Sequence, residues 1–241
     1  MRVTELRLLR VYFGISATLL SFLALAGFRL SPRTTERFAE IDVERINLIE
    51  KDGTRRLIIS NRERSPAVYT HGDTIGQPGR RAGLIFYNDS ASEVGGLVFG
   101  GYREKSGKVN QGLSLTFDQY DQDQVVALQH IDEGGSRYQG LTVNDRPEPA
   151  LVEILARQRH IDSMPAGVRR DSARAVWLAW QGGVALGARR LFVGRNRDRA
   201  SVINLADPIG RVRLRLMVDS LGGAQIQFLD SLGHVQSTLP K

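Results

Sequence analysis

Histidine and cysteine are the side chains most often used for acid–base, nucleophilic and metal chemistry, and this chain of 241 residues contains few of them. Its four histidines are scattered, and no two of them have the spacing of a helical metal site. They are His71, His130, His160 and His234. Cysteine is absent, which excludes disulfides, zinc–cysteine sites, iron–sulfur clusters and thiol nucleophiles. These residues therefore predict no catalytic centre, no metal site and no cofactor.

Carboxylates are densest in the segment FDQYDQD, which carries Asp118, Asp121 and Asp123. Calcium prefers several carboxylates on one flexible loop, but the glycine and the terminal glutamate of an EF-hand are both missing. The pattern favours a solvated turn between two strands over a calcium site. Glu93, Asp118 or Asp121 would also suit the paired carboxylates of glycoside hydrolysis, a reaction that depends on their separation in space.

Arginine supplies most of the net charge of +7. Arg211, Arg213 and Arg215 alternate with apolar residues, so we expect them in a row on an exposed strand face. Such a row is suited to binding phosphates or acidic sugars, and it would equally keep a sheet from pairing edge to edge with others. The sequence has no nucleic-acid recognition motif, so nucleic acid is not an expected partner.

The run 200–235 contains the strongest structural pattern of the chain. The turn sequence Asp-x-x-Gly begins at Asp207, Asp219 and Asp230. Between these turns apolar residues such as Leu214 and Leu216 alternate with polar ones. A period of two places one set of side chains on a buried face and the other set in water. The run therefore predicts antiparallel strands joined by hairpins, with the inward side chains forming the core.

Looser versions of this unit recur through most of the chain, beginning with a hairpin at Asp52-Gly53. The pattern changes at 148–183, where helical spacing and a Gly182-Gly183 end predict one or two inserted helices. Trp177 and Trp180 are three residues apart and would share a helix face, which we expect to pack the insertion onto the sheet. The fold class is mainly β: an antiparallel hairpin meander, closed as a sandwich or left as an open roll, with this helical insertion.

The N-terminal segment is basic and then apolar. Three arginines precede an uncharged run of eighteen residues from Val11 to Phe28, which as a helix would reach about 27 Å, close to the thickness of the bilayer hydrocarbon. The positive charges favour a cytoplasmic N-terminus, so an uncleaved signal-anchor is one reading. A signal peptide cleaved near Ala26 is the other, because Ala24-Leu25-Ala26 fits the small-x-small cleavage pattern.

These patterns divide the chain into a leader, a linker and one β domain. The leader spans 1–29, the linker spans 30–44, and the β domain spans 45–241 with its helical insertion at 148–183.

Four segments resemble an uncharacterised family of bacterial exported or membrane-anchored β-rich proteins. They are IDVERINLIEKDGTRRLIISN (41–61), AGLIFYND (82–89), GGLVFGG (95–101) and LSLTFDQYDQDQVVALQ (113–129). The run 200–235 fits the repeat-like ending of that family, whereas 148–183 does not match it. The resemblance implies an exported β-rich protein. It supplies no activity, so no catalytic residue is carried over.

The sequence thus favours a non-enzymatic binding or structural module of the cell envelope. We expect it in the inner membrane with its β domain outside the cytoplasm, or secreted or periplasmic after cleavage. The expected partners are the membrane, through the N-terminal helix, and a protein or a further copy of the chain at the sheet edges. The alternative is an envelope enzyme acting on a glycan or a lipid headgroup, with an acidic site near 118–124 or in the loop 61–81.

Overall fold

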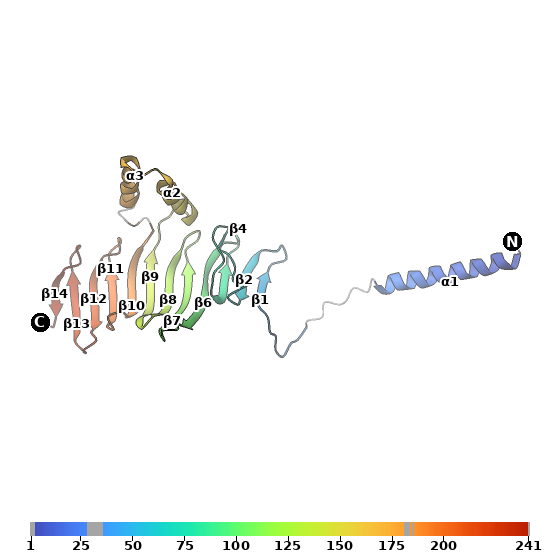
Figure 1. The fold of residues 1–241 in the computed structure, drawn as a ribbon, viewed down its shortest axis with the longest axis horizontal. Helices are drawn as coiled ribbons and strands as arrows, with labels where there is room; N and C mark the ends of the chain where they lie inside the picture. Colours follow the sequence, from blue (N-terminus) through green and yellow to red (C-terminus); the bar gives the residue numbers. More distant parts are fainter. Residues whose placement is uncertain (1–2, 28–35, 181–183, 185, 241) are drawn as a thin grey trace. The chain divides into compact units, whose positions relative to one another are not determined.

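One antiparallel sheet dominates the fold, and its strands follow one another across the sheet almost in the order of the sequence (Figure 1). The computed structural model describes residues 3–27, 36–180, 184 and 186–240. It divides into two units, residues 1–42 and 43–241, which are considered separately. Within the described residues the sheet has twelve strands, in the order β1-β2-β5-β6-β7-β8-β9-β10-β11-β12-β13-β14. The strands β3 and β4 form a separate two-stranded hairpin.

Apart from a short hairpin within the loop expected at 61–81, the strands form the hairpin meander that the sequence predicts. They are β1 (Arg45–Ile49), β2 (Arg55–Ser60), β3 (Tyr69–Thr70), β4 (Asp73–Thr74), β5 (Ala82–Tyr87), β6 (Glu93–Arg103), β7 (Val109–Asp118), β8 (Gln124–Glu133), β9 (Ser136–Asp145), β10 (Ala188–Arg195), β11 (Ser201–Ala206), β12 (Val212–Val218), β13 (Ala224–Leu229) and β14 (Val235–Leu239). The mainly β antiparallel meander is confirmed. The first and last strands of the order, β1 and β14, do not pair with each other, so the sheet is open. The described residues therefore do not form a sandwich within one chain.

The three Asp-x-x-Gly segments form the predicted turns, and all three use the same hydrogen bonds. In the turn at Asp219, Oδ1 accepts hydrogen bonds from the backbone N–H of Leu221 and of Gly223, both at 2.8 Å. Gly222 has φ of 92°, a left-handed conformation that glycine adopts without steric cost. In the backbone of this turn, Asp219 N–H donates to the Gly223 carbonyl and Gly222 N–H donates to the Asp219 carbonyl. Five further turns, at 50–54, 88–92, 104–108, 119–123 and 196–200, share these two backbone hydrogen bonds. One short turn type therefore recurs along the sheet.

We expect Asp219→Ala to lower the melting temperature by a few degrees, because two backbone N–H groups lose their acceptor. Asp219→Asn should retain most of the stability, since an amide oxygen can accept the same two hydrogen bonds. Thermal unfolding of the two variants beside the wild type measures the difference. Equal losses in both variants would show that the carboxylate charge, rather than the acceptor geometry, holds this turn.

The inserted segment forms two helices, α2 (Leu151–Ser163) and α3 (Val168–Ala179), which Figure 1 shows at one end of β9 and β10. Ile154, Ile161 and Trp177 are buried together, and the Trp177 and Trp180 rings stack at a centroid distance of 5.3 Å. The prediction that the tryptophan face packs onto the sheet is therefore wrong: the two helices bury their apolar stripes against each other. Gly182 and Gly183 lie outside the described residues.

The N-terminal unit contains one helix, α1 (Val3–Gly27), so the helical form of the leader is confirmed. Among the residues that the structure describes, however, no helix has both the length and the apolar character needed to cross a membrane. The expected membrane span is thus not identified. Phe28 and the first part of the expected linker, residues 30–35, lie outside the described residues.

Side chains on the sheet alternate between two faces, and the burial differs from the sequence prediction. On β12 the apolar Val218 is 45% exposed. On the opposite face Arg215 is half-buried, and it donates hydrogen bonds to Asn204 Oδ1 (3.1 Å) and to Gln227 Oε1 (3.3 Å). The apolar set was expected to point into a core. It shares one face as predicted, but no second layer of the described residues covers that face at Val218.

Candidate functional site

A continuous row of aliphatic side chains crosses the whole sheet, with one residue from each strand. Each member is the direct cross-strand partner of the next. The members of this aliphatic row are Ile46, Ile59, Leu84, Leu97, Leu115, Leu128, Leu141, Val193, Ile203, Leu216, Ile226 and Leu239. Directly paired residues lie on the same face. We call the face that carries this row the apolar face.

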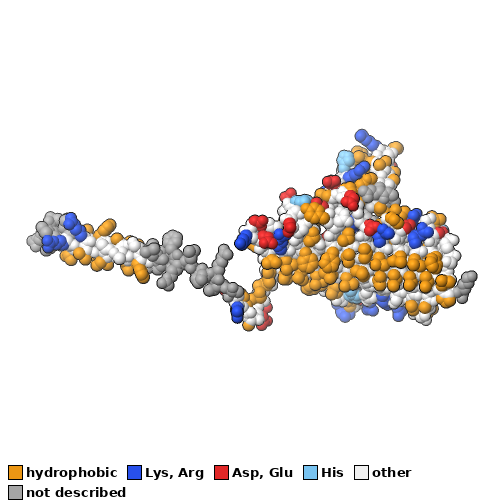
Figure 2. All heavy atoms as spheres, turned by 180° about the vertical axis from the view of Figure 1, so that it is seen from behind, with side chains coloured by type: hydrophobic (Ala, Val, Ile, Leu, Met, Phe, Trp, Pro, Cys, Tyr) orange, Lys and Arg blue, Asp and Glu red, His pale blue; other side chains and the backbone are white. Residues whose placement is uncertain are grey.

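A second row runs beside the first, offset by two residues on each strand, after the first row on one strand and before it on the next. Its members are Leu48, Leu57, Phe86, Gly95, Phe117, Val126, Val143, Leu191, Leu205, Leu214, Phe228 and Ser237. The two rows together hold no charged side chain. Figure 2 shows the hydrophobic side chains as bands that run across the sheet.

The aliphatic row is open to solvent in the described chain. None of its twelve members is buried there, and Leu128, near the middle of the row, is 53% exposed. The largest apolar patch on a typical soluble monomer covers about 300–600 Å², and larger ones mark interaction sites. A patch that extends over twelve strands is therefore the strongest functional signal in this structure.

Part of the apolar face is hollowed. A shallow cavity of about 630 Å³ lies along β10 to β14. Members of the aliphatic row line it, among them Val193, Ile203 and Ile226. Its apolar lining suits aliphatic or acyl groups rather than a charged substrate.

Two carboxyl groups lie at one end of the neighbouring strands β6 and β7. Burial, together with the nearby charge of Asp118, raises the pKa of Glu93 to about 7. Burial and the charge of Asp123 likewise raise the pKa of Asp118 to about 7. Oδ1 of Asp118 is buried without a hydrogen-bond partner among the described residues. A carboxyl group that holds its proton to such a pH has the acidity of a general acid.

The structure brings together the two loops that the sequence offers as alternative catalytic positions. His71, in the loop 61–81, lies with Nε2 at 3.1 Å from Oδ2 of Asp121, in the 119–123 turn. The backbone N–H of His71 also donates to Oγ of Ser92 at 2.9 Å. Asp123 is paired instead with Arg146, at 3.3 Å. Asp121 and Asp123 thus have different partners, and the preference for a solvated turn over calcium binding stays a prediction.

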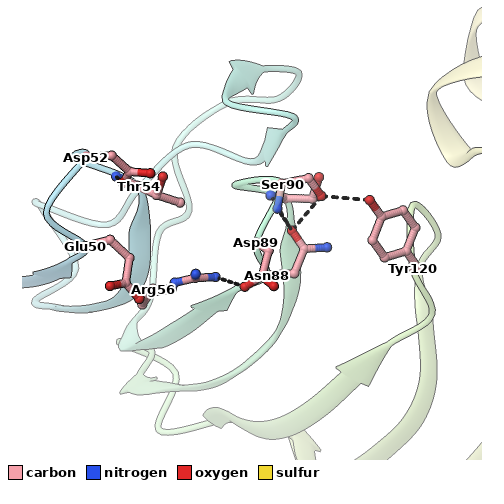
Figure 3. Close-up of polar contacts among 9 residues, drawn as sticks. Glu50, Asp52, Thr54, Arg56, Asn88, Asp89, Ser90 and Tyr120 are labelled. Atoms are coloured by element: carbon pink, nitrogen blue, oxygen red, sulfur yellow. Dashed lines mark hydrogen bonds and ion pairs between the residues drawn. The ribbon is translucent and has the colours of Figure 1, made fainter.

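The adjoining turn 88–92 is tied to both of its neighbours by polar side chains (Figure 3). Oγ of Ser90 lies 3.0 Å from the hydroxyl of Tyr120 and donates to Oδ1 of Asn88 at 2.9 Å. Arg56 of β2 bridges the same turn to the 50–54 turn by pairing with Asp89 and with Glu50. These contacts connect the turns at this end of the strands. Each of them engages the side chain with another protein group.

Glu93, Asp118 and His71 line none of the principal hollows of the described residues. Across the described ranges, no group of three or more histidine, aspartate and glutamate side chains is placed to hold a metal ion. The larger hollows of the described chain lie elsewhere. Besides the apolar cavity, one of about 500 Å³ is lined by residues that include Arg62, Arg81 and Tyr102. Sequence reasoning missed this hollow, because its arginines come from a loop and its other lining residues come from the four strands β5 to β8.

The three arginines expected to bind polyanions make contacts within the protein. Arg211 Nε donates to Asp207 Oδ2 at 2.8 Å, and Arg213 Nε donates to the Leu229 carbonyl at 3.0 Å. Arg215 is held by Asn204 and Gln227, as described above. Arg213 and Arg215 lie on the same face, two residues apart in β12, whereas Arg211 belongs to the preceding turn. Polyanion binding at these residues stays a prediction.

Comparison with protein-family models, with curated proteins and with solved structures found no match. The resemblance to exported β-rich proteins thus stays a prediction, and the function has to be argued from the sheet itself.

Proposed function

We propose that this chain is a non-enzymatic binding or structural module of the cell envelope, and that the apolar face of its sheet is the surface through which it works. The observation that carries this proposal is the aliphatic row. It is unbroken over twelve strands and unburied in the described chain. Exposed aliphatic area of this extent is unfavourable in water, so a partner that covers it would be held by the hydrophobic effect.

The proposed location rests on the N-terminal sequence. Arginines followed by eighteen uncharged residues, with a small-x-small motif near Ala26, support targeting to or across the inner membrane. Fractionation of cells that express the full chain tests this part, and the mass of the mature protein separates an uncleaved anchor from cleavage near Ala26. Recovery of the full chain in the cytosol would contradict it.

An envelope enzyme acting on a glycan or a lipid headgroup is the second candidate, favoured by the His71–Asp121 contact and by the raised pKa values of Glu93 and Asp118. Against it, both loops are tied to neighbouring protein groups, and the larger hollows lie elsewhere. The apolar face therefore supports the first candidate better.

Site-specific photo-crosslinking in cells tests the working surface. A benzophenone amino acid replaces either Leu128, on the apolar face, or the adjacent Gln129, on the opposite face of β8. We expect covalent adducts from position 128 and none from position 129, because a partner on the apolar face lies within reach of the first position alone. Adducts from both positions in equal yield, or none from position 128, would overturn the proposal.

A further inference from the structure

We propose that the partner of the apolar face is a second copy of this chain, packed with its own apolar face against the first. This inference rests on the proposed function, because it names the partner of the same surface. The two open sheets would form the two layers of a β-sandwich that a single chain lacks.

The size of the surface is the first argument. Twelve strands about 4.8 Å apart span roughly 55 Å, and two rows of side chains cover roughly 14 Å along the strands. Each copy would thus contribute roughly 800 Å², which is the contribution of each partner to a standard specific interface. The two rows are also depleted of charge, as the buried centre of an interface between copies should be.

The shape of the surface is the second argument. A two-fold axis that lies midway between the sheets and parallel to the strands lays both rows of one copy over the same rows of the other, with β1 over β14. This arrangement pairs apolar with apolar residues over almost the whole patch, because the aliphatic row has no polar interruption and the second row has only Ser237. Such a self-complementary patch is what a two-fold interface requires.

The charges along the two margins of the apolar face, at the ends of the strands, are the third argument. They favour a second copy of the chain over a lipid surface as the partner. Five arginines near the ends of the strands are paired with carboxylates of the same chain. The pairs are Arg146–Asp123, Arg190–Asp145 and Arg211–Asp207 at one end, and Arg137–Asp132 and Arg197–Glu133 at the other. An anionic membrane surface attracts unpaired basic residues. Margins that carry both positive and negative charges in such pairs suit a second protein surface with the same composition.

The position of the two-fold axis gives a direct test. This axis passes between β8 and β9, the sixth and seventh strands of the sheet, so Leu128 of one copy should lie close to Leu128 of the other. The chain has no cysteine. Leu128→Cys and Gln129→Cys therefore each place a single thiol in the full-length protein, on opposite faces of one strand.

A short, membrane-permeant bismaleimide added to cells that express these variants should link Leu128→Cys into a covalent dimer. We expect at least a tenfold higher yield of a species with twice the chain mass than from Gln129→Cys. In the Leu128→Cys background, Ile226→Lys should reduce this yield about tenfold, because it buries a charge in the proposed interface. Gln225→Lys, on the opposite face of β13, should leave the yield unchanged.

Equal dimer yields from the two cysteine positions would overturn the inference, and so would a dimer that is insensitive to Ile226→Lys. Failure of this inference can be told from failure of the proposed function. If benzophenone at position 128 captures a lipid or a different protein, the second copy is wrong and the working surface stands. If position 128 captures nothing, both proposals fail.

Discussion

Adding one methyl group at Gly194 (Gly194→Ala) is expected to destabilise the sheet by about 3 kcal/mol or more, at the upper end of what overpacking costs. Gly194 lies in β10, directly opposite Gly140 of β9. A Cβ atom built on Gly194 would lie 2.0 Å from the Gln139 carbonyl oxygen and 2.6 Å from the Gly140 Cα. Both obstacles are backbone atoms of a paired strand. They cannot move aside as a side chain would, so the two strands must separate locally.

The same position borders the buried cluster of Phe192, Ala200 and Val202, against which Tyr138 and Met217 pack. Separation of β9 from β10 would disturb this cluster as well. Denaturant unfolding of Gly194→Ala beside Gly222→Ala measures the effect. Gly222 has open space around its Cα and φ of 92°, so its substitution should cost about 1 kcal/mol, through backbone conformation alone. Losses of equal size would show that steric contact at Gly194 is relieved cheaply.

Raising the pH from about 4.5 to about 8 is expected to destabilise the domain through Glu93 and Asp118. In the folded chain each carboxyl holds its proton up to about pH 7, whereas in the unfolded chain each releases it near its ordinary pKa of 4.5 or 3.8. Between these values the folded state binds more protons than the unfolded state. The stability that the neutral carboxyls provide is therefore complete below about pH 4 and is lost as the pH rises through 7.

We expect each group to contribute about 2 kcal/mol to this loss, a value reduced from the full pKa shift because both carboxyls are partly exposed to solvent. Glu93→Gln and Asp118→Asn should each flatten the pH dependence of the melting temperature between pH 4.5 and 8. Glu63→Gln, at an exposed loop position, should not. A wild-type melting temperature that is constant over this range would refute the assignment.

The local structure was readable from the sequence, because its signals are local. Each Asp-x-x-Gly segment supplies a side-chain acceptor and a residue free to take positive φ, and these two requirements define the turn. The period of two in 212–218 likewise identified which residues share a face. The helices of the insertion followed from their spacing.

The aliphatic row was not readable, because it depends on the register of eleven successive strand pairs. Leu128 and Val193 belong to one row only if every turn and bulge between their strands has the right length, and the sequence leaves these lengths open. The prediction of where the core lies was wrong for a related reason. Alternation shows that Leu214 and Arg213 point in opposite directions, but not whether a second layer exists to cover the apolar side. The convergence of His71 with Asp121 is also a long-range fact, since fifty residues separate them.

Apart from the small β3–β4 hairpin, each inner strand of the sheet pairs with the strand that precedes it and the strand that follows it, and the end strands β1 and β14 have one partner each. Most of the connections are short turns, so closing each hairpin costs little chain entropy, and assembly can spread outward from whichever hairpin forms first. No strand inserts between two earlier ones. If a hairpin were added to or deleted from such a chain, the later strands would move along the sheet and every other pairing would be kept. The length of the sheet can therefore vary in steps of two strands, as the length of a solenoid varies with its number of repeats.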